Sequence, residues 1–146
     1  MREQKIRSLA SAPVGPLELQ SPDQQFVAIR SLEAITEADS VYVNASGYLG
    51  RAVATASATM HAIGLAFQTT GSGLPTRVIV AGPFHSANIN ASGYIGRFAY
   101  AATAAGAPQT TPPSSSGQLV QVVGHYIDGS SIQVAIQGAF QRGGTL

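Results

Sequence analysis

The stretch QLVQVVGHYIDGSSIQVAI, residues 118–136, consists of two apolar segments on either side of a short polar turn. QLVQVVGHYI (118–127) and SIQVAI (131–136) are rich in β-branched residues, as strands usually are. The dipeptide Asp128-Gly129 between them is typical of two-residue hairpin turns, which need positive backbone torsions. The stretch therefore predicts two antiparallel strands joined by a tight turn.

Similar apolar runs recur along most of the chain. They are spaced about 8–15 residues apart, separated by Gly, Pro, Asn and Ser, with no helical pattern between them. This spacing predicts an all-β fold, a small sandwich or barrel of about eight short strands. Besides the two strands above, we expect strands at residues 26–30, 40–43, 51–56, 61–67, 77–82 and 97–101.

Two segments interrupt the strand pattern. SLEAITEAD (31–39) has Leu32 and Ile35 at a helical interval, but it is so short that a helical turn and a loop remain alternatives. AGAPQTTPPSSSG (105–117) contains three prolines and five serines or threonines. Proline restricts its own torsion and that of the preceding residue, so this segment is predicted to be a long loop.

One phrase of eight residues occurs twice, as NASGYLGR (44–51) and NASGYIGR (90–97). Asn-Ala-Ser-Gly fits a turn whose glycine takes the left-handed conformation, and a strand is predicted to follow each copy. A phosphate-binding loop would need a different glycine spacing, or a lysine, and then a helix. We therefore interpret the phrase as a turn used twice, in two hairpins at related positions.

The chain of 146 residues predicts one β domain at residues 26–140, preceded by an extended arm (1–25) and followed by a short tail (141–146). No apolar run reaches the ~20 residues of a membrane span, and the N-terminus lacks the apolar segment of a signal peptide. We therefore expect no membrane partner. The absence of cysteine excludes disulfides and thiolate ligands, which suits the reducing cytosol as the place of synthesis.

Charged residues are scarce and unevenly distributed. They make up 10% of the chain, against about 25% in an average domain, and only Arg51, Arg77, Arg97, Asp128 and Arg142 lie beyond residue 40. Charged groups are depleted from the cores of protein interfaces, so this composition favours a body that is partly buried against other subunits. A surface of Ser, Thr, Gln and Asn is the alternative. Because no cluster of Lys and Arg follows residue 7, we expect no nucleic-acid partner.

The predicted arm, residues 1–25, contains three prolines and no sustained apolar period. A solvated terminus is the ordinary interpretation of such a segment. An arm that binds a neighbouring subunit would explain its apolar residues better, and these are the predicted contacts: Ile6, Leu9, Val14, Leu17 and Leu19.

Residues suited to catalysis are few. His61, His85 and His125 have no metal-binding spacing, and a lone histidine in a strand is usually structural. Carboxylates are concentrated near the N-terminus, and there is no G-x-S-x-G motif for a serine nucleophile. We therefore expect no enzyme activity, no cofactor and no metal.

Tyr48 and Tyr94 each follow the left-handed glycine of the repeated phrase. Most aromatic residues of a β domain pack in the core or across strands. Tyrosine is also enriched at interfaces, so these two are candidate contacts with a subunit or partner, and both interpretations stay open.

The body from about residue 32 to residue 140 resembles a β module of tailed-bacteriophage virion proteins, among them head decoration (cement) proteins. The resemblance lies in the order of several short motifs. These are D-x-V-Y-V-N-x-x-G (39–47), an Ala/Thr-rich stretch (52–59), A-I-G-L-A (62–66), V-I-V-A-G (78–82), T-P-P-S-S-S-G (111–117) and the closing strands (118–136). One departure is NINASGYIGRFAYA (88–101), which stands where a plain glycine-linked strand is expected.

The resemblance implies a virion protein located on the outer surface of the phage head. Its implied partners are the major capsid protein and further copies of itself, with a trimer favoured and the N-terminal arm laced onto a neighbour. The alternative is a tail or fibre module that binds a receptor or carbohydrate through its β loops, although the chain has no shaft repeat.

Overall fold

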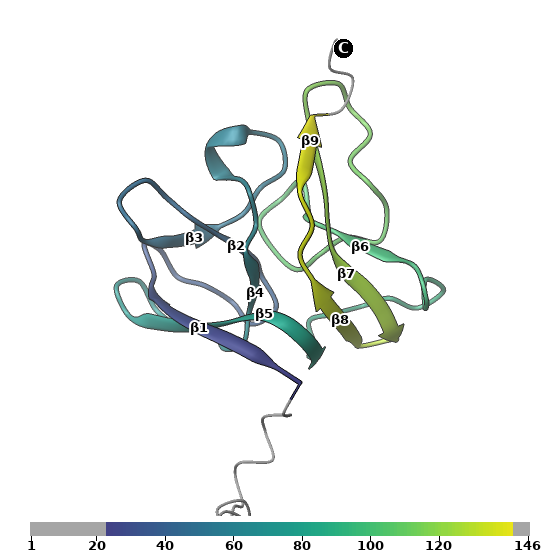
Figure 1. Cartoon of the computed structure of the whole chain (residues 1–146), viewed down its shortest axis with the longest axis horizontal. Helices are drawn as coiled ribbons and strands as arrows, with labels where there is room; N and C mark the ends of the chain where they lie inside the picture. Colours follow the sequence, from purple (N-terminus) through teal and green to yellow (C-terminus); the bar gives the residue numbers. More distant parts are fainter. Residues whose placement is uncertain (1–22, 142–146) are drawn as a thin grey trace, which may run out of the picture.

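The structure is a computed structural model that describes residues 23–141. These residues form nine β-strands and a 3₁₀ turn at Ser57–Thr59, so the all-β prediction is confirmed (Figure 1). Residues 1–22 and 142–146, which include most of the predicted arm and tail, lie outside the described part. The strands are β1 (Gln25–Arg30), β2 (Ser40–Val43), β3 (Leu49–Arg51), β4 (Gly64–Ala66), β5 (Pro75–His85), β6 (Phe98–Tyr100), β7 (Leu119–Asp128), β8 (Ser131–Ala135) and β9 (Ala139–Gln141).

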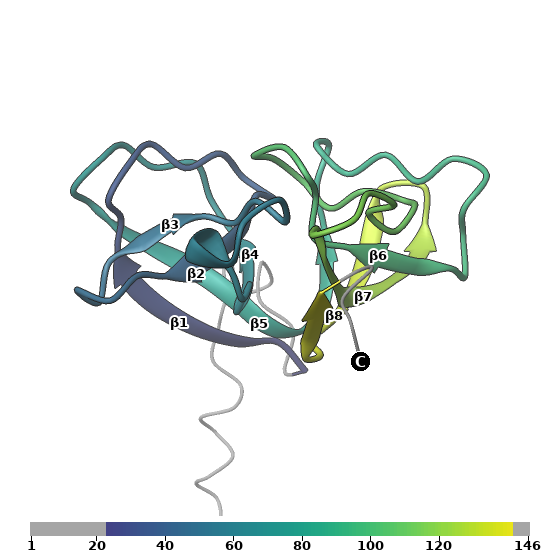
Figure 2. The ribbon, with the colours of Figure 1, turned by 90° about the horizontal axis from the view of Figure 1, so that it is seen from above.

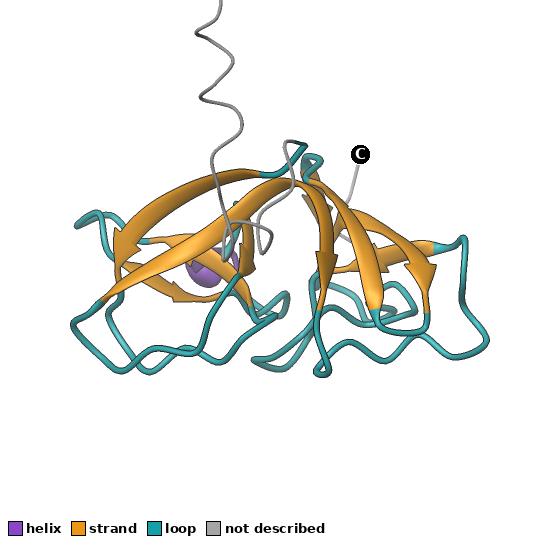
Figure 3. Cartoon of the chain, turned by 90° about the horizontal axis from the view of Figure 1, so that it is seen from below, coloured by secondary structure: helices purple, strands orange, loops and turns teal. Residues whose placement is uncertain are grey.

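The strands belong to one sheet that curls into a half-barrel. The order is β3-β2-β4-β5-β8-β7-β6, while β1 pairs with β5 and β9 pairs with β7. Figures 2 and 3 show the strands forming an arch of two halves, with the long loops gathered on its concave side. β1 to β4 lie in the N-terminal half and β6 to β9 in the C-terminal half, and β5 runs from one to the other.

β5 connects the halves because it changes partners along its length. Residues 75–81 pair with β1, and residues 81–85 pair with β8. Just after these parts meet at Ala81, Gly82 has a φ of 112°, a region that side chains disfavour. A Cβ at Gly82 would lie 2.5 Å from the backbone oxygen of Asp23, so the chain entering β1 passes directly over this glycine. The Gln24 side chain then donates a hydrogen bond of 2.7 Å to the Pro83 carbonyl.

A second constraint closes the N-terminal half. Immediately after β1, Ser31 forms a parallel bridge with Leu49 of β3, and the Leu32 N–H donates to the Leu49 carbonyl at 2.7 Å. The pairings β1–β5, β5–β4, β4–β2 and β2–β3 thereby become a ring. A smaller core lies against this ring and consists of Ile35, Val41, Leu49, Ala66 and Val78.

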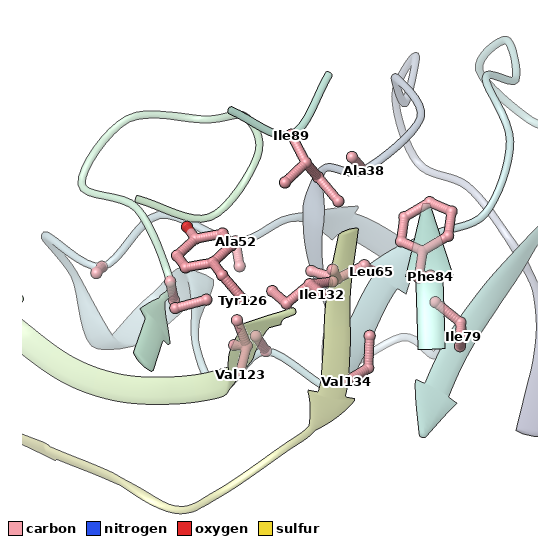
Figure 4. Packing of buried hydrophobic residues seen from close by; sticks show 14 of the residues in the cluster. Ala38, Ala52, Leu65, Ile79, Phe84, Ile89, Val123, Tyr126, Ile132 and Val134 are labelled. Carbon is pink, nitrogen blue, oxygen red and sulfur yellow. The ribbon is translucent and has the colours of Figure 1, made fainter. Parts of the chain in front are cut away.

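The larger core is shared by both halves (Figure 4). Tyr126 and Ile132 come from β7 and β8, Leu65 from β4, and Ile79 and Phe84 from β5. Many of its other members are alanines, which let loops and strands approach closely: Ala38, Ala52, Ala54, Ala62, Ala91, Ala99 and Ala101. Burial of this shared cluster holds the halves together, since apolar burial contributes about 25 cal/mol per Å².

The hairpin predicted at residues 118–136 is confirmed, because β7 and β8 pair antiparallel with Tyr126 opposite Ile132. The predicted positive torsions are wrong, since neither Asp128 nor Gly129 has a positive φ. Instead the Asp128 carboxylate accepts a hydrogen bond of 2.8 Å from the Ser130 N–H. That side-chain contact, together with a register shift after Tyr126, shapes the turn without left-handed residues.

The first repeated phrase is the predicted turn. Asn44 Oδ1 accepts hydrogen bonds from the Ser46 and Tyr48 N–H groups, at 2.9 and 3.0 Å. Gly47 is left-handed, with a φ of 87°, and the flanking strands β2 and β3 pair antiparallel.

The second phrase keeps the left-handed glycine, Gly93, but the prediction of a second hairpin is wrong. The structure has no strand directly before it, and β6 after it pairs with β7. The reason lies in its backbone partners. The Ala91 N–H donates to the Gly129 carbonyl and the Gly96 N–H to the Tyr126 carbonyl, so the β7–β8 hairpin holds the phrase.

Other predicted boundaries also change. Residues 31–39 form no helix: Ile35 bridges Thr70, and Ala38 has a φ of 79°. Of the predicted strand 51–56 only Arg51 is in a strand, because Ala52 and Ala54 are buried as loop residues whose N–H groups donate to distant carbonyls. The strand 61–67 shortens to β4, and 77–82 lengthens to β5. Strand β9 was not predicted.

Replacement of Gly82 tests the close approach at β5. We expect Gly82→Ala to lower the free energy of unfolding by ~3 kcal/mol, because a left-handed torsion and a backbone overlap are combined. Gly47→Ala is the matched control, since Gly47 has a similar torsion but no atom within 4 Å of its Cβ position. It should cost ~1 kcal/mol in urea unfolding. Equal losses would contradict the proposed role of the overlap.

Alkaline titration tests the burial of Tyr126. Burial raises the pKa of Tyr126 to about 12, from 10.0. The resulting stability is complete below pH 10 and is lost as the pH rises toward 12, because the unfolded chain ionises first. Tyr126→Phe should change stability little at pH 7, since the Tyr126 hydroxyl donates only a long bond, 3.4 Å, to the Pro108 carbonyl. The variant should lose less stability than the wild type between pH 10 and 12, measured by urea unfolding. Equal losses of stability by Tyr126→Phe and the wild type between pH 10 and 12 would contradict the raised pKa of Tyr126.

Candidate interaction surface

The features that stand out on the body are exposed apolar side chains. Large apolar residues are usually buried, and contiguous exposed ones mark interaction sites. Backbone hydrogen bonds bring some of these exposed residues close together in two groups, one in each half of the sheet. The exposed large apolar residues are Val27, Leu32, Val43, Tyr48, Leu74, Ile95, Phe98, Ile127 and Phe140.

The N-terminal group consists of Leu32, Tyr48 and Leu74. The Leu32 N–H donates to the Leu49 carbonyl, next to Tyr48, and the Ser31 N–H donates to the Leu74 carbonyl at 2.9 Å. Ser72 Oγ donates to the Leu32 carbonyl at 3.1 Å. Three segments distant in sequence are thus held together where β1 meets β3, and each presents one apolar side chain.

The C-terminal group consists of Ile95, Phe98 and Ile127, whose side chains are 58%, 54% and 44% exposed. Phe98 of β6 pairs with His125 of β7, two residues before Ile127. The Gly96 N–H donates to the Tyr126 carbonyl, and the Tyr126 N–H donates to the Arg97 carbonyl. These bonds fix the second phrase beside β7, with its apolar residue toward solvent.

The two copies of the repeated phrase expose opposite residues. In the first copy Leu49 is fully buried and Tyr48 is 41% exposed. In the second copy Ile95, equivalent to Leu49, is exposed, whereas Tyr94 packs against the larger core beneath the Arg97 guanidinium, 5.8 Å from the ring centroid. Tyr48 is therefore accessible as a contact residue, and Tyr94 has a packing role within the chain.

The predicted arm contacts Ile6, Leu9, Val14, Leu17 and Leu19 lie outside the described residues. The structure does not place them relative to Tyr48 or Tyr94. Sequence reasoning did not select Ile95, Phe98 or Ile127. The first of these had a signal, since it is the one position at which the repeated phrases differ.

The arginines of residues 23–141 each contact other groups of the chain. Arg51 Nε lies 3.1 Å from the nearly buried Asp39 carboxylate. The Arg77 guanidinium stacks on the Phe26 and Phe67 rings, 4.4 and 5.1 Å from their centroids. Arg30 donates to the Gly73 carbonyl at 2.6 Å. Their positive charge is spread over separate sites rather than collected on one face.

Groups that could support catalysis do not converge in the part that the structure describes. All three histidines are exposed, and no cluster of three His, Asp or Glu residues suits a metal within residues 23–141. His85 Nδ1 lies 3.0 Å from Ser131 Oγ. The nearby Asp128 carboxyl has a pKa lowered mainly by its hydrogen bond from the Ser130 N–H. Over the same residues there is no pocket in which a small substrate would be enclosed.

Comparison with protein families and with curated proteins gives no match. No protein-family model matches the chain, and no curated protein matches it. Among the described residues, no helix is long and apolar enough to cross a membrane.

Alanine replacement separates the roles of the two tyrosines. Tyr94→Ala should lower the free energy of unfolding by ~2 kcal/mol, because a partly buried ring leaves the larger core. Tyr48→Ala should cost less than ~1 kcal/mol, as expected for an exposed residue. Chemical denaturation of both variants measures the difference. Equal costs would show that exposure does not distinguish these positions.

Proposed function

We propose that the protein is a capsid decoration protein that binds the outer surface of a tailed-phage head as a homo-oligomer. The observation that carries the proposal is a charge-poor β body with an exposed apolar group in each half. Such a surface suits burial against other polypeptides, since interface cores are depleted in charge and enriched in aromatic residues. The resemblance of the ordered motifs to phage virion modules supports the choice of partner class.

A body of this kind would stabilise a capsid by adding contacts across subunit junctions. Packaged DNA pushes capsid subunits apart, and a protein bound across a junction adds interface that must break before they separate. An oligomer binds several capsid subunits at once, so weak single contacts combine into high avidity. An extended arm that pairs with a neighbour adds main-chain hydrogen bonds to the same assembly.

Binding to capsids tests the proposal directly. The protein should co-sediment with expanded, undecorated capsids of its cognate phage and should raise the temperature at which filled heads release DNA. Phe98→Ser and Leu74→Ser are informative variants, because each removes one exposed apolar side chain without opening the core. Loss of co-sedimentation in either variant, with an unchanged unfolding midpoint and an unchanged native mass, would identify the face that contacts the capsid.

Absence of co-sedimentation by the wild-type protein would overturn the proposal. Binding to host cell envelopes or polysaccharide instead would favour the tail or fibre alternative. Self-association is measured separately by the native mass of the full chain and of a chain that begins at residue 23. That boundary keeps Gln24, which donates to Pro83, and Gln25, the first residue of β1. We expect an oligomer for the full chain.

A further inference from the structure

A second short repeat connects the N-terminal segment with the body. Residues 6–9 read IRSL, and residues 29–32 read IRSL again. The chain thus carries two copies of IRSL and two copies of NASGY-Leu/Ile-GR. In the structure the second IRSL (29–32) pairs with the first phrase (44–51). The first IRSL (6–9) lies outside the described residues.

The described pair shows how IRSL recognises the phrase. Ser31 of the second IRSL bridges Leu49 of the first phrase in parallel, and the Leu32 N–H donates to the Leu49 carbonyl at 2.7 Å. Ile29 packs against the smaller core that contains Leu49. The Leu49 side chain is fully buried in that core, together with Ile35, Val41, Ala66 and Val78, whereas the Leu32 side chain remains exposed. The IRSL segment therefore binds the backbone at the aliphatic residue that follows the tyrosine, and its isoleucine packs against the core that holds this residue.

The second phrase presents the same position uncovered. Ile95 is equivalent to Leu49, and its side chain is 58% exposed. Neither its N–H nor its carbonyl has a hydrogen-bond partner among residues 23–141. Figure 2 shows the segment between β5 and β6, which contains Ile95, at the outer end of the C-terminal half.

We propose that residues 6–9 of a neighbouring copy pair in parallel with Ile95, as residues 29–32 pair with Leu49. In this arrangement the Leu9 N–H donates to the Ile95 carbonyl, and the side chain of Ile6 packs against Ile95. The inference rests on the self-association in the proposed function and names its site. The exposed Phe98 and Ile127 beside Ile95 give the incoming segment an apolar surface larger than a single side chain.

Two differences from the described Ser31–Leu49 pair limit the strength of each proposed contact at Ile95. Glu33, which follows the second IRSL and accepts the Arg51 N–H at 2.9 Å, is replaced by Ala10 after the first. Ile95 lies in a tight turn in which the Arg97 N–H donates to the Tyr94 carbonyl, so the pairing is confined to one bridge. The described Ser31–Leu49 pair is also an isolated bridge. Several such contacts in a closed oligomer make the assembly stable.

A neighbouring copy is the occupant because the body is poor in charge. If residues 6–9 bound Ile95 of their own chain, the protein would stay monomeric and its other exposed apolar side chains would remain in water. The 13 residues between Leu9 and Asp23 span up to ~45 Å when extended, which is enough to reach another subunit.

Disulfide trapping between single-cysteine variants tests the site. The chain has no cysteine, so Ser8→Cys and Ile95→Cys each introduce one thiol, at the positions equivalent to the paired Ser31 and Leu49. Residues paired across strands lie within the Cα distance that a disulfide needs. The two purified variants are mixed and oxidised mildly, and the covalent dimer is measured. Ser8→Cys mixed with Phe140→Cys is the control, since Phe140 is exposed in the same half, on β9, and is not part of the proposed contact.

We expect about tenfold more covalent heterodimer with Ile95→Cys than with Phe140→Cys, because pairing raises the effective thiol concentration. Ile6→Asp in the Ser8→Cys chain should abolish the excess. In a chain that carries both Ser8→Cys and Ile95→Cys, a disulfide that forms only within the chain, without dimer, would overturn the neighbouring copy as occupant. No disulfide in a protein whose native mass is oligomeric would overturn the site and leave the proposed self-association standing. A monomeric native mass would remove both.

Discussion

The arch of the protein depends on β5 continuing through Gly82 from one half of the sheet into the other. Side chains along a regular strand alternate between faces, so Ile79 and Phe84 would point to opposite sides of a flat sheet. Both belong to the larger core. A register shift that leaves Val80 without a partner on β1, and the positive torsion at Gly82, together re-aim the strand. Asp23 and Gln24 pass over the bend, where a side chain on Gly82 would obstruct them. This irregular stretch of β5 thereby allows one core to be shared by two sets of strands.

The fold class and most strands could be predicted, because β-branched runs and turn residues are local signals. What the sequence could not reveal were the contacts between distant segments. Leu32 and Ile35 have a helical spacing, but Ile35 is drawn into the smaller core and Leu32 is bound to Leu49. The two repeated phrases are nearly identical, yet one lies in a hairpin and the other against the β7–β8 turn. Their surroundings, and not their own residues, decide the outcome.

The sequence could predict that an interaction surface exists, but not which residues form it. Scarce charge favoured the interpretation that the body is partly buried against other polypeptides, and the tyrosines of the repeated phrase were candidate contacts. The structure separates them, because Tyr94 is held under Arg97 while Tyr48 remains accessible. Ile95, Phe98 and Ile127 required the register between β6 and β7 to be known, since alternation alone does not say which face of a strand is covered. The IRSL repeat became informative only because the structure pairs one copy with Leu49, which suggests how the other copy could bind Ile95.

The central claim is that the exposed apolar surface of this body is covered by other polypeptide when the protein acts. Hydrogen exchange at the Ile95 amide tests it most directly, because that amide has no hydrogen-bond partner in residues 23–141 and becomes protected only if another segment covers it. The account predicts slow exchange of peptides covering residues 90–98 in the full-length protein, and fast exchange at Ile95 in a chain beginning at residue 23. Equally fast exchange at Ile95 in both proteins, at concentrations where the full chain is assembled, would contradict it.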